Sequence, residues 1–430
     1  MITELVILVE GVIMGRVFEQ TKRGGTLSFQ YDPGWLELNG AFPLSVSMPL
    51  SEAPYRQRFI KTFLVNLLPE NPAILEAWEK KYHVSRNNPF ALLRHVGEDV
   101  PGALQFVQPD RLAEYQDPGP ARIQWVTMDQ LSKRMALLQK DAAAFRLAND
   151  QGRMSLAGAQ AKTALYFDGK RWGVPAGRVP TSHILKPRIP GFDGIVENEH
   201  LCQDIAARCG LVAARSFVLS LDEPVIVVER FDRLPHPDPA LILRRVHQED
   251  MCQALQKLPG EKYQESRGSG VETIVRLIRD VSTANTEDVW RFIDANILNY
   301  LIGGTDAHAK NYSLLLGANR QVRLSPLYDV STQLPYKNKI PQRLAMKIGR
   351  FYEIASITAA DWESLARRCK LDEAQMIERV SALAQMLPDQ IAASRDQALR
   401  EKLNAPSIRE ASELMLKHVV ARLKGLGRVA

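Results

Sequence analysis

The densest polar cluster of this chain reads Thr305-Asp306-Ala307-His308-Ala309-Lys310-Asn311, directly after an apolar run that ends at Gly303-Gly304. The apolar residues before it recur at helical spacing, namely Trp290, Ile293, Ile297, Leu298, Leu301 and Ile302. A strongly polar run at the end of such a helix must lie on a loop. Two apolar runs at 312–316 and 322–324 flank a turn and predict a hairpin, which Asp329 closely follows.

Two aspartates and one asparagine therefore occur in a fixed order around this hairpin. Asn311 lies five residues after Asp306, the spacing of the catalytic loop of protein kinases. Kinases need one aspartate that accepts the proton of the substrate hydroxyl, and an asparagine and a second aspartate that hold Mg²⁺. The spacing favours these roles for Asp306, Asn311 and Asp329. Alone, the string is also compatible with a solvated loop or with a metal hydrolase that uses His308.

Weaker signals precede this loop. Small residues from Ser155 to Lys162 enter a strand and can bring backbone N–H groups close to phosphates, although an ordinary tight turn has the same composition. Lys186 ends an apolar strand, and Glu199 lies on the predicted helix after it, as in the lysine–glutamate pair of kinases. Residues 229–231 close the strand-rich region. The order of these elements indicates a kinase more strongly than any one of them.

Length and composition set the frame for this interpretation. With 430 residues, the chain is too long to fold around a single hydrophobic core. Its contents of 45% hydrophobic and 24% charged residues are usual for a globular protein. No apolar run reaches the length of a membrane span, and the N-terminus lacks the basic start of a signal peptide, so we expect a cytoplasmic protein. A net charge of +6 does not argue for nucleic-acid binding. The four cysteines form no CxxC pair and are expected to be buried thiols.

The coarse pattern predicts an α+β protein with three regions. Residues 1–125 read as a β-rich subdomain and a linker, with strands at 5–9, 12–18 and 27–31 and helices at 58–68 and 73–80. The stretch 108–120 reads as a linker or an irregular excursion. Residues 126–232 read as a strand-rich lobe that opens with a capping box at Thr127, and residues 233–430 read as a helical lobe with the catalytic loop.

Together these motifs resemble the HipA family, the serine/threonine kinase toxins of bacterial type II toxin–antitoxin modules. The residues that carry the resemblance are Ser155 to Leu165, Val228 to Arg233, Gln248 to Gln253 and Thr305 to Ser313. The resemblance implies a bilobal, protein-kinase-like α+β fold with an N-terminal β-rich accessory subdomain and an all-α C-terminal lobe. It also implies ATP and Mg²⁺ as cofactors.

The resemblance assigns roles to individual residues. Asp306 would be the base, Asn311 and Asp329 the Mg²⁺ ligands, and Ser155 a site of autophosphorylation. The nucleotide would be bound by the phosphate loop, the strand lysine and the lobe junction, that is by Ala157, Gly158, Ala159, Gln160, Ala161, Lys162, Lys186, Glu229, Arg230, Phe231, His308 and Tyr328.

The resemblance further implies a biological role. Such a toxin phosphorylates a protein hydroxyl, with glutamyl-tRNA synthetase or a related translation component as the expected substrate, and arrests growth. A HipB-like helix-turn-helix antitoxin is the expected partner, and operator DNA would be bound mainly through it. Ala161 and Ala307 depart from the usual family motif. The alternative is a non-catalytic antitoxin or operator co-repressor with a kinase fold. The presence of Asp306, Asn311, Asp329 and Lys186 argues against it.

Overall fold

The computed structural model describes residues 2–20, 25–117, 121–147, 149–150, 152–238 and 242–426. The chain forms two compact units. The first contains residues Met1–Pro187, Ser220–Pro259 and Leu314–Val322, and the second contains Arg188–Leu219, Gly260–Ser313 and Arg323–Ala430. The chain thus passes between the units several times, which no pattern in the sequence predicts.

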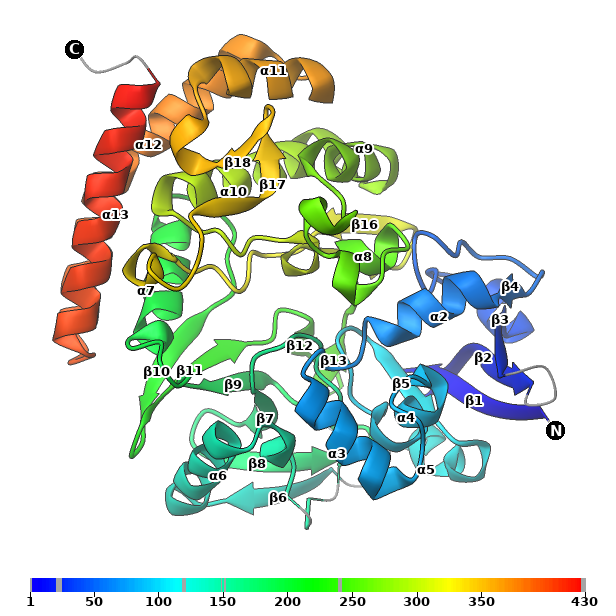
Figure 1. Ribbon diagram of the computed structural model, residues 1–430. Coiled ribbons are helices and arrows are strands. Elements are labelled where there is room, and N and C mark those ends of the chain that lie inside the picture. The colour runs from blue at the N-terminus through cyan, green and yellow to red at the C-terminus, as the bar shows by residue number, and fades with distance from the viewer. Residues whose placement is uncertain are drawn as a thin grey trace. The chain divides into compact units, whose positions relative to one another are not determined.

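The first unit begins with an antiparallel sheet in the order β4-β3-β2-β1-β5 (Figure 1). Its strands are β1 (Ile2–Val9), β2 (Val12–Gln20), β3 (Thr26–Tyr31), β4 (Tyr55–Arg56) and β5 (Leu104–Val107). Four helices accompany them, α1 (Pro33–Glu37), α2 (Gln57–Val65), α3 (Pro72–Tyr82) and α4 (Pro89–Val96). The three predicted strands and two predicted helices are confirmed, whereas α4 and β5 were not predicted because their apolar runs are short.

The stretch expected to be a linker or an excursion packs against this sheet. It contains the 3₁₀ turn η2 (Pro109–Arg111) and α5 (Ala113–Gln116). Tyr115 is fully buried there and packs with Val6, Leu8 and Val107. Residues 118–120, which include Pro118 and Pro120, lie outside the described residues. The described part is therefore an excursion with its own core contact.

A second antiparallel sheet of the first unit contains the strands β11-β9-β7-β8-β6 in this order. Their bounds are β6 (Arg122–Val126), β7 (Thr163–Phe167), β8 (Trp172–Ala176), β9 (His183–Pro187) and β11 (Pro224–Glu229). The capping box predicted at Thr127 is confirmed at the start of α6 (Met128–Lys140), where Thr127 and Gln130 exchange hydrogen bonds.

Short elements complete the first unit. They are β12 (Arg233–Pro235), β13 (Leu243–Arg245), β14 (His247–Asp250), α8 (Met251–Ala254), β15 (Ser313–Gly317) and β16 (Gln321–Leu324). The last two form the hairpin that was predicted after the polar cluster.

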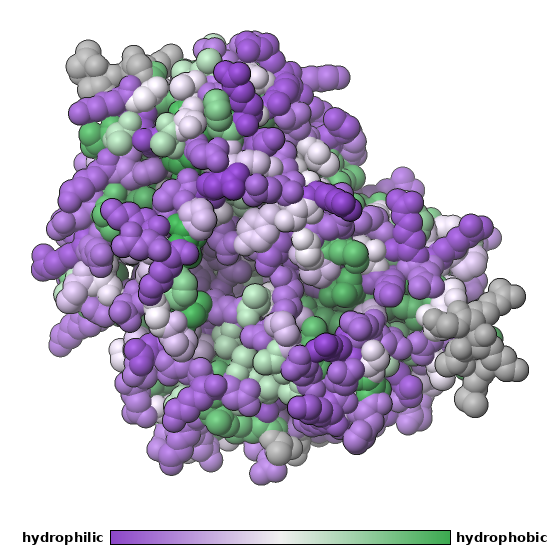
Figure 2. Space-filling model, in the orientation of Figure 1, coloured by the Kyte–Doolittle hydropathy of each residue, from purple (hydrophilic) through white to green (hydrophobic). Residues whose placement is uncertain are grey.

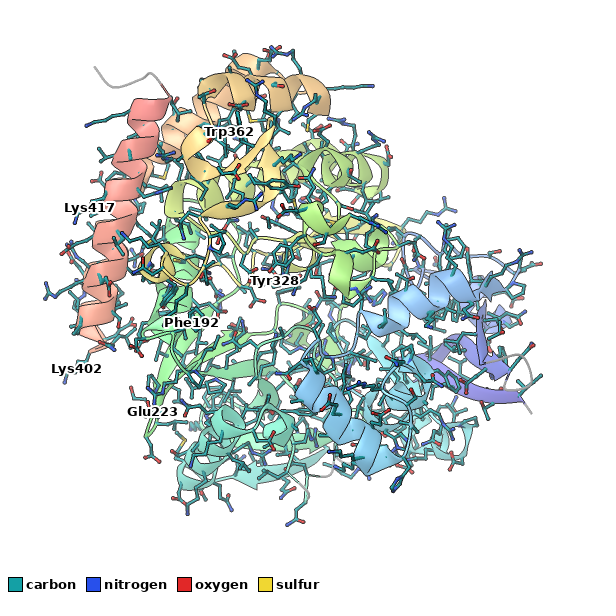
Figure 3. The ribbon with its side chains drawn as sticks, viewed as in Figure 1. Phe192, Glu223, Tyr328, Trp362, Lys402 and Lys417 are labelled. Atoms are coloured by element: carbon teal, nitrogen blue, oxygen red, sulfur yellow. The ribbon has the colours of Figure 1, made fainter. Side chains whose placement is uncertain are left out.

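Helices dominate the second unit. They are α7 (Ile195–Arg208), α9 (Val271–Val281), α10 (Asn285–Ile302), α11 (Ala359–Cys369), α12 (Glu373–Arg400) and α13 (Ala405–Gly425). Strand β10 (Ser216–Ser220) and the pair β17 (Arg343–Ile348) and β18 (Phe351–Glu353) add a small β component. Trp362 of α11, labelled in Figure 3, is fully buried. Its ring packs edge to face with that of Tyr300 of α10, and the ring centroids are 5.5 Å apart.

Polar and apolar residues separate as expected for a globular protein. Hydrophilic side chains cover most of the face seen in Figure 2. All four cysteines are buried and free, as predicted, and burial raises the pKa of the Cys202 and Cys209 thiols to about 12. In the described part of the chain, no helix is both long enough and apolar enough to cross a membrane.

Candidate active site

The polar cluster begins where α10 ends. Gly303 caps this helix with a left-handed backbone (φ +72°), a conformation that glycine adopts without strain. The backbone N–H of Gly304 donates to the carbonyl of Asn299 at 2.7 Å. The chain therefore leaves the buried helix sharply, and the residues from Thr305 form the predicted loop.

Asp306 and Asn311 contact each other across this loop. The side-chain Nδ2 of Asn311 donates to the backbone carbonyl of Asp306 at 2.9 Å. A carbonyl can only accept a hydrogen bond, so this contact fixes which end of the amide is nitrogen. The Asn311 amide therefore meets the Asp306 carbonyl through its nitrogen and not through its oxygen, and Asp306 is exposed.

Asp329 has a left-handed backbone, with a φ of +55°. Non-glycine residues are uncommon in this region, and such conformations gather at functional sites. The preceding residue, Tyr328 (Figure 3), joins this segment to the loop, because its hydroxyl contacts the Ser313 hydroxyl at 2.7 Å and donates to the Lys310 carbonyl at 2.8 Å. Tertiary contacts thus bring the third predicted residue, Asp329, to the segment that carries the first two.

His308 has a buried ring with a strongly perturbed ionisation. Burial lowers its pKa to about 3, helped by the nearby charge of Lys262. The imidazole is therefore neutral near pH 7. Its Nδ1 has no hydrogen-bond partner among the described residues. This environment suits a side chain that shapes the loop.

The oxygens of Asn311 and Asp329 suit a magnesium ion. Mg²⁺ prefers hard oxygen ligands and is often held by one or two protein groups together with substrate phosphates. Within the described ranges, no three His, Cys, Asp or Glu side chains come together in a way that could hold a metal. An ion at these two residues would therefore draw further ligands from a bound nucleotide or from water.

The first unit carries the loop of small residues before β7. Gly158 has a φ of +103°, and a Cβ added there would lie 2.7 Å from the Lys162 Nζ. Lys162 folds back over the loop and donates to the carbonyl of Ala157 at 3.0 Å. A bridge to Pro69 and a hydrogen bond from the Glu70 N–H to the Gly158 carbonyl hold the loop on its other side. The position of Gly158 accordingly requires glycine.

Ser155 is fully buried at the start of this loop. Its hydroxyl donates to the carbonyl of Leu67 at 2.8 Å, and its backbone N–H donates to the carbonyl of Asp99 at 3.0 Å. In this conformation the hydroxyl cannot meet a second molecule.

The predicted nucleotide contacts of the first unit lie at two places in the second sheet. Lys186 is buried on the central strand β9, opposite Ile226 of β11. Glu229 is exposed at the end of β11, and Phe231 follows it half-buried. Lys186 and Glu229 are therefore on neighbouring strands of one sheet.

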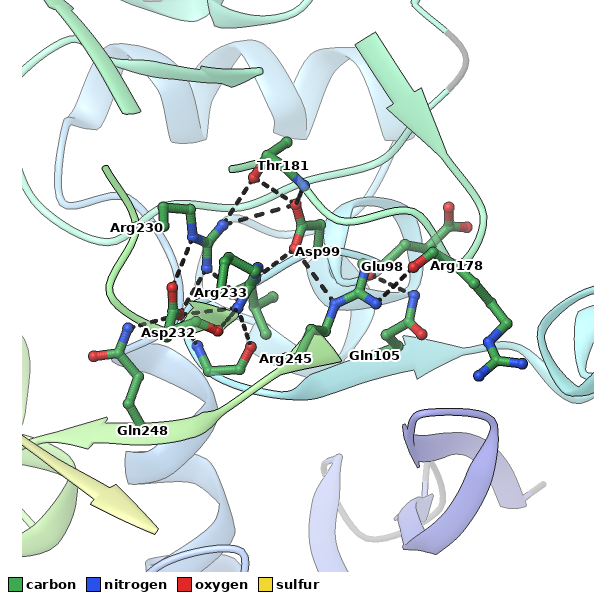
Figure 4. Close-up of polar contacts among 12 residues, drawn as sticks. Glu98, Asp99, Gln105, Arg178, Thr181, Arg230, Asp232, Arg233, Arg245 and Gln248 are labelled. Atoms are coloured by element: carbon green, nitrogen blue, oxygen red, sulfur yellow. Dashed lines mark hydrogen bonds and ion pairs between the residues drawn. The ribbon is translucent and has the colours of Figure 1, made fainter. Parts of the chain in front are cut away.

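Arg230 has a different environment from its neighbours. Its guanidinium is buried and pairs with both oxygens of Asp232, at 3.0 Å from Nε and 2.9 Å from Nη2 (Figure 4). It also donates to the Thr181 hydroxyl and to the Val100 carbonyl. The family resemblance places Arg230 in the nucleotide site, and its side chain makes these structural contacts, so any contact with a nucleotide there would fall to its backbone.

This contact belongs to a buried ion cluster that we define by Asp99, Arg230, Asp232, Arg233 and Arg245. All five side chains are 10% exposed or less, so nearly all of their charge is removed from water. The cluster joins a turn near β5 to the segment after β11 and to β13, all within the first unit (Figure 4). The sequence does not reveal it because Asp99 is far along the chain from Arg230, Asp232, Arg233 and Arg245.

Comparisons with known proteins give the relationships of the chain. Residues 5–107 match the model of the HipA N-terminal domain, and residues 154–391 match that of the HipA-like C-terminal domain. A putative kinase, Y4mE of Sinorhizobium fredii, is 34% identical over 89% of this chain and 90% of its own length. The serine/threonine-protein kinase toxin HipA of Shewanella oneidensis is 28% identical over 85% of this chain and 84% of its own.

A solved structure is similar in fold. It is that of a Shewanella oneidensis HipA, HipB and operator DNA complex, with a TM-score of 0.82, 24% identity and coverage of 98% of this chain and 97% of that one. The α+β class and the two-part kinase-like architecture predicted from the sequence are confirmed by this match.

Proposed function

Because the chain belongs to the HipA family, we propose that it is an ATP-dependent serine/threonine kinase toxin of a type II toxin–antitoxin module. The arrangement of the catalytic loop carries this proposal. Asn311 is bonded to the backbone of Asp306, and Tyr328 ties the strained Asp329 segment to the same loop. Protein kinases use a catalytic aspartate, an asparagine and a second aspartate for phosphoryl transfer, and a solvated loop would need none of them.

The proposed roles follow from the chemistry of each side chain. Asp306 would accept the proton of the substrate hydroxyl, and Asn311 and Asp329 would hold Mg²⁺. The ion, when bound, would neutralise negative charge on the transferred phosphate. Lys186 and the loop of residues 157–162 would bind the phosphates.

The remaining assigned residues would complete the nucleotide site. Glu229, Phe231 and the backbone of Arg230 would line the adenine pocket. His308 and Tyr328 would act mainly by shaping the loop.

The partners and the substrate are part of the same proposal. A HipB-like antitoxin would bind the protein in the cytoplasm and link it to operator DNA as a co-repressor. The protein substrate would be an aminoacyl-tRNA synthetase, with glutamyl-tRNA synthetase as the first candidate. Support comes from the relative named as a kinase toxin and from the similar structure, which is a complex with HipB and operator DNA.

The first experiment measures phosphate transfer by the purified full chain. Incubation with Mg²⁺ and γ-³²P-ATP should label the protein, and EDTA should remove the labelling. Mass spectrometry should place the phosphate on Ser155. Labelling that is absent from the wild-type protein at every Mg²⁺ and ATP concentration would overturn the proposal and favour a non-catalytic co-repressor.

Phosphorylation of Ser155 should release its loop and so inactivate the protein. A phosphate brings a charge of about −1.5 to −2, and its oxygens cannot donate to the Leu67 carbonyl as the buried hydroxyl does. The phosphate must therefore leave this position. We expect the amides of Asp99 and Ser155, which bond to the Arg153 and Asp99 carbonyls, to exchange on the order of tenfold faster or more in the phosphorylated protein.

Hydrogen-exchange mass spectrometry of the labelled and unlabelled protein measures this effect. Ser155→Ala incubated with ATP is the matched control and should show no change, and the amides of α6 should exchange equally in all samples. Unchanged exchange at Asp99 and Ser155 after full phosphorylation would contradict the release of the loop.

A further inference from the structure

A tyrosine outside every predicted motif contacts the proposed base. The hydroxyl of Tyr263 donates to Asp306 Oδ1 at 2.5 Å. Hydrogen bonds from a hydroxyl to an ionised carboxylate are short and roughly twice as strong as neutral ones. Tyr263 lies 43 residues before Asp306. Only the tertiary structure brings the two side chains together, and both belong to the second unit.

The backbone around Tyr263 is fastened on both sides. The carbonyl of the preceding residue, Lys262, accepts a hydrogen bond from the N–H of Ala309 within the catalytic loop at 3.1 Å. The carbonyl of Tyr263 itself accepts from Ser266 at 2.9 Å and from Gly268 at 3.0 Å. A Cβ on Gly268 would lie only 2.4 Å from that carbonyl oxygen, so the turn requires glycine. The segment is therefore built against the loop and does not merely pass near it.

The ring of Tyr263 is also held in place. It meets the buried imidazole of His308 edge to face, with ring centroids 5.0 Å apart. The next residue, Gln264, accepts a hydrogen bond from the Lys347 N–H at 2.7 Å, which anchors the segment to β17. Backbone and ring contacts together hold the phenol where its hydroxyl meets Asp306. The buried His308 ring therefore supports the ring of Tyr263.

We propose that Tyr263 is a positioning residue that fixes the orientation of the Asp306 carboxylate for phosphoryl transfer. The inference rests on the proposed kinase function and deepens it. In the transfer step, the substrate oxygen bonds to the γ-phosphorus of ATP, the bond from that phosphorus to the bridging oxygen breaks, and ADP leaves. The hydroxyl proton passes to the Asp306 carboxylate. If the Asp306 carboxylate were free to rotate, its oxygen would be oriented toward the hydroxyl proton for a smaller fraction of the time, and proton transfer would be slower.

The test uses Tyr263→Phe, which removes the hydroxyl and keeps the ring that packs on His308. Loss of a hydrogen bond to a charged group should lower the maximal rate of phosphate incorporation on the order of tenfold. The ATP concentration at half-maximal rate and the affinity for a fluorescent ADP analogue should both stay within about twofold. A rate that falls at constant nucleotide binding distinguishes positioning from general loosening of the fold.

Tyr352→Phe is the matched control. Tyr352 is also a half-buried tyrosine of the second unit, and its ring contacts Arg343 and Lys347. This variant should retain the wild-type rate. Wild-type activity is measured first, so an inactive wild-type protein would count against the proposed function and not against Tyr263. With an active wild type, an unchanged rate in Tyr263→Phe overturns the inference. An increased rate overturns it as well, because the phenol would then be blocking the place of the substrate hydroxyl.

Discussion

Replacement of Asp306 by glutamine is expected to lower phosphate incorporation by about 10²–10⁴-fold, the usual contribution of a general base. Glutamine cannot accept the proton of the substrate hydroxyl at neutral pH. The backbone carbonyl of residue 306 would still accept the Asn311 amide, so the loop should keep its shape. Nucleotide affinity should therefore change little. Initial rates of γ-³²P incorporation and titration with a fluorescent ADP analogue measure the two effects separately.

Asp396→Gln provides the control for this prediction. Asp396 is exposed on α12 and pairs with its neighbour Arg395 at 2.8 Å. An exposed pair of this kind contributes little to stability, so the variant should label like the wild type. Equal labelling of wild type and Asp306→Gln would show that another group takes the proton. A parallel loss of nucleotide binding would show that the substitution disturbs the loop as a whole.

Replacement of Asp232 by asparagine should have the largest effect on stability. Asp232 accepts hydrogen bonds from Arg230, Gln248 and the Gly102 N–H, at 2.7–3.0 Å, and pairs with Arg233 at 3.1 Å. An asparagine amide would place N–H donors among the donors that now meet the carboxylate, and the three buried guanidiniums would share Asp99 as the one carboxylate left in the cluster. Removal of one partner from a buried ion pair costs about 3–5 kcal/mol. We expect the free energy of unfolding of the first unit to fall by about this amount.

Asp129→Asn tests the same change where solvent surrounds the pair. Asp129 and Lys133 pair at 2.8 Å on α6, with 70% and 75% of their side chains exposed. The loss there should stay below about 1 kcal/mol. Urea unfolding measures both variants, and hydrogen exchange at residues 99–102 and 230–233 assigns the loss to the first unit. Equal effects for Asp232 and Asp129 would refute a stabilising role of the buried cluster.

The ion cluster also predicts how stability depends on pH. Burial alone would raise the pKa of Asp99, but the guanidiniums of Arg233, Arg230 and Arg245 outweigh burial and lower it to about 2. A carboxyl group with a lowered pKa stabilises the folded state above its unfolded value of about 3.9. This stabilisation is lost as the pH falls from about 4 to about 2. Acid unfolding of the first unit should begin in this window, measured by circular dichroism.

The sequence by itself determined features that depend on neighbouring residues. Apolar periodicity located strands β1 to β3 and helices α2, α3 and α10, and the capping box at Thr127 located the start of α6. The five-residue spacing between Asp306 and Asn311 suits a loop that their own hydrogen bond closes. These features follow from backbone periodicity and local hydrogen bonding, which a short window of sequence contains.

The tertiary structure alone decided which distant groups meet. Arg230 lies in the stretch 229–231 that the family resemblance assigns to the nucleotide, and only the fold shows that its guanidinium is buried against Asp232 and Asp99. The Ser155 hydroxyl is buried against Leu67, 88 residues away, and Tyr263 reaches Asp306 across 43 residues. Such contacts depend on how whole elements pack, and packing gives them no recurring spacing along the chain. For this reason the sequence predicts the reactive residues, and only the fold reveals what holds them in place.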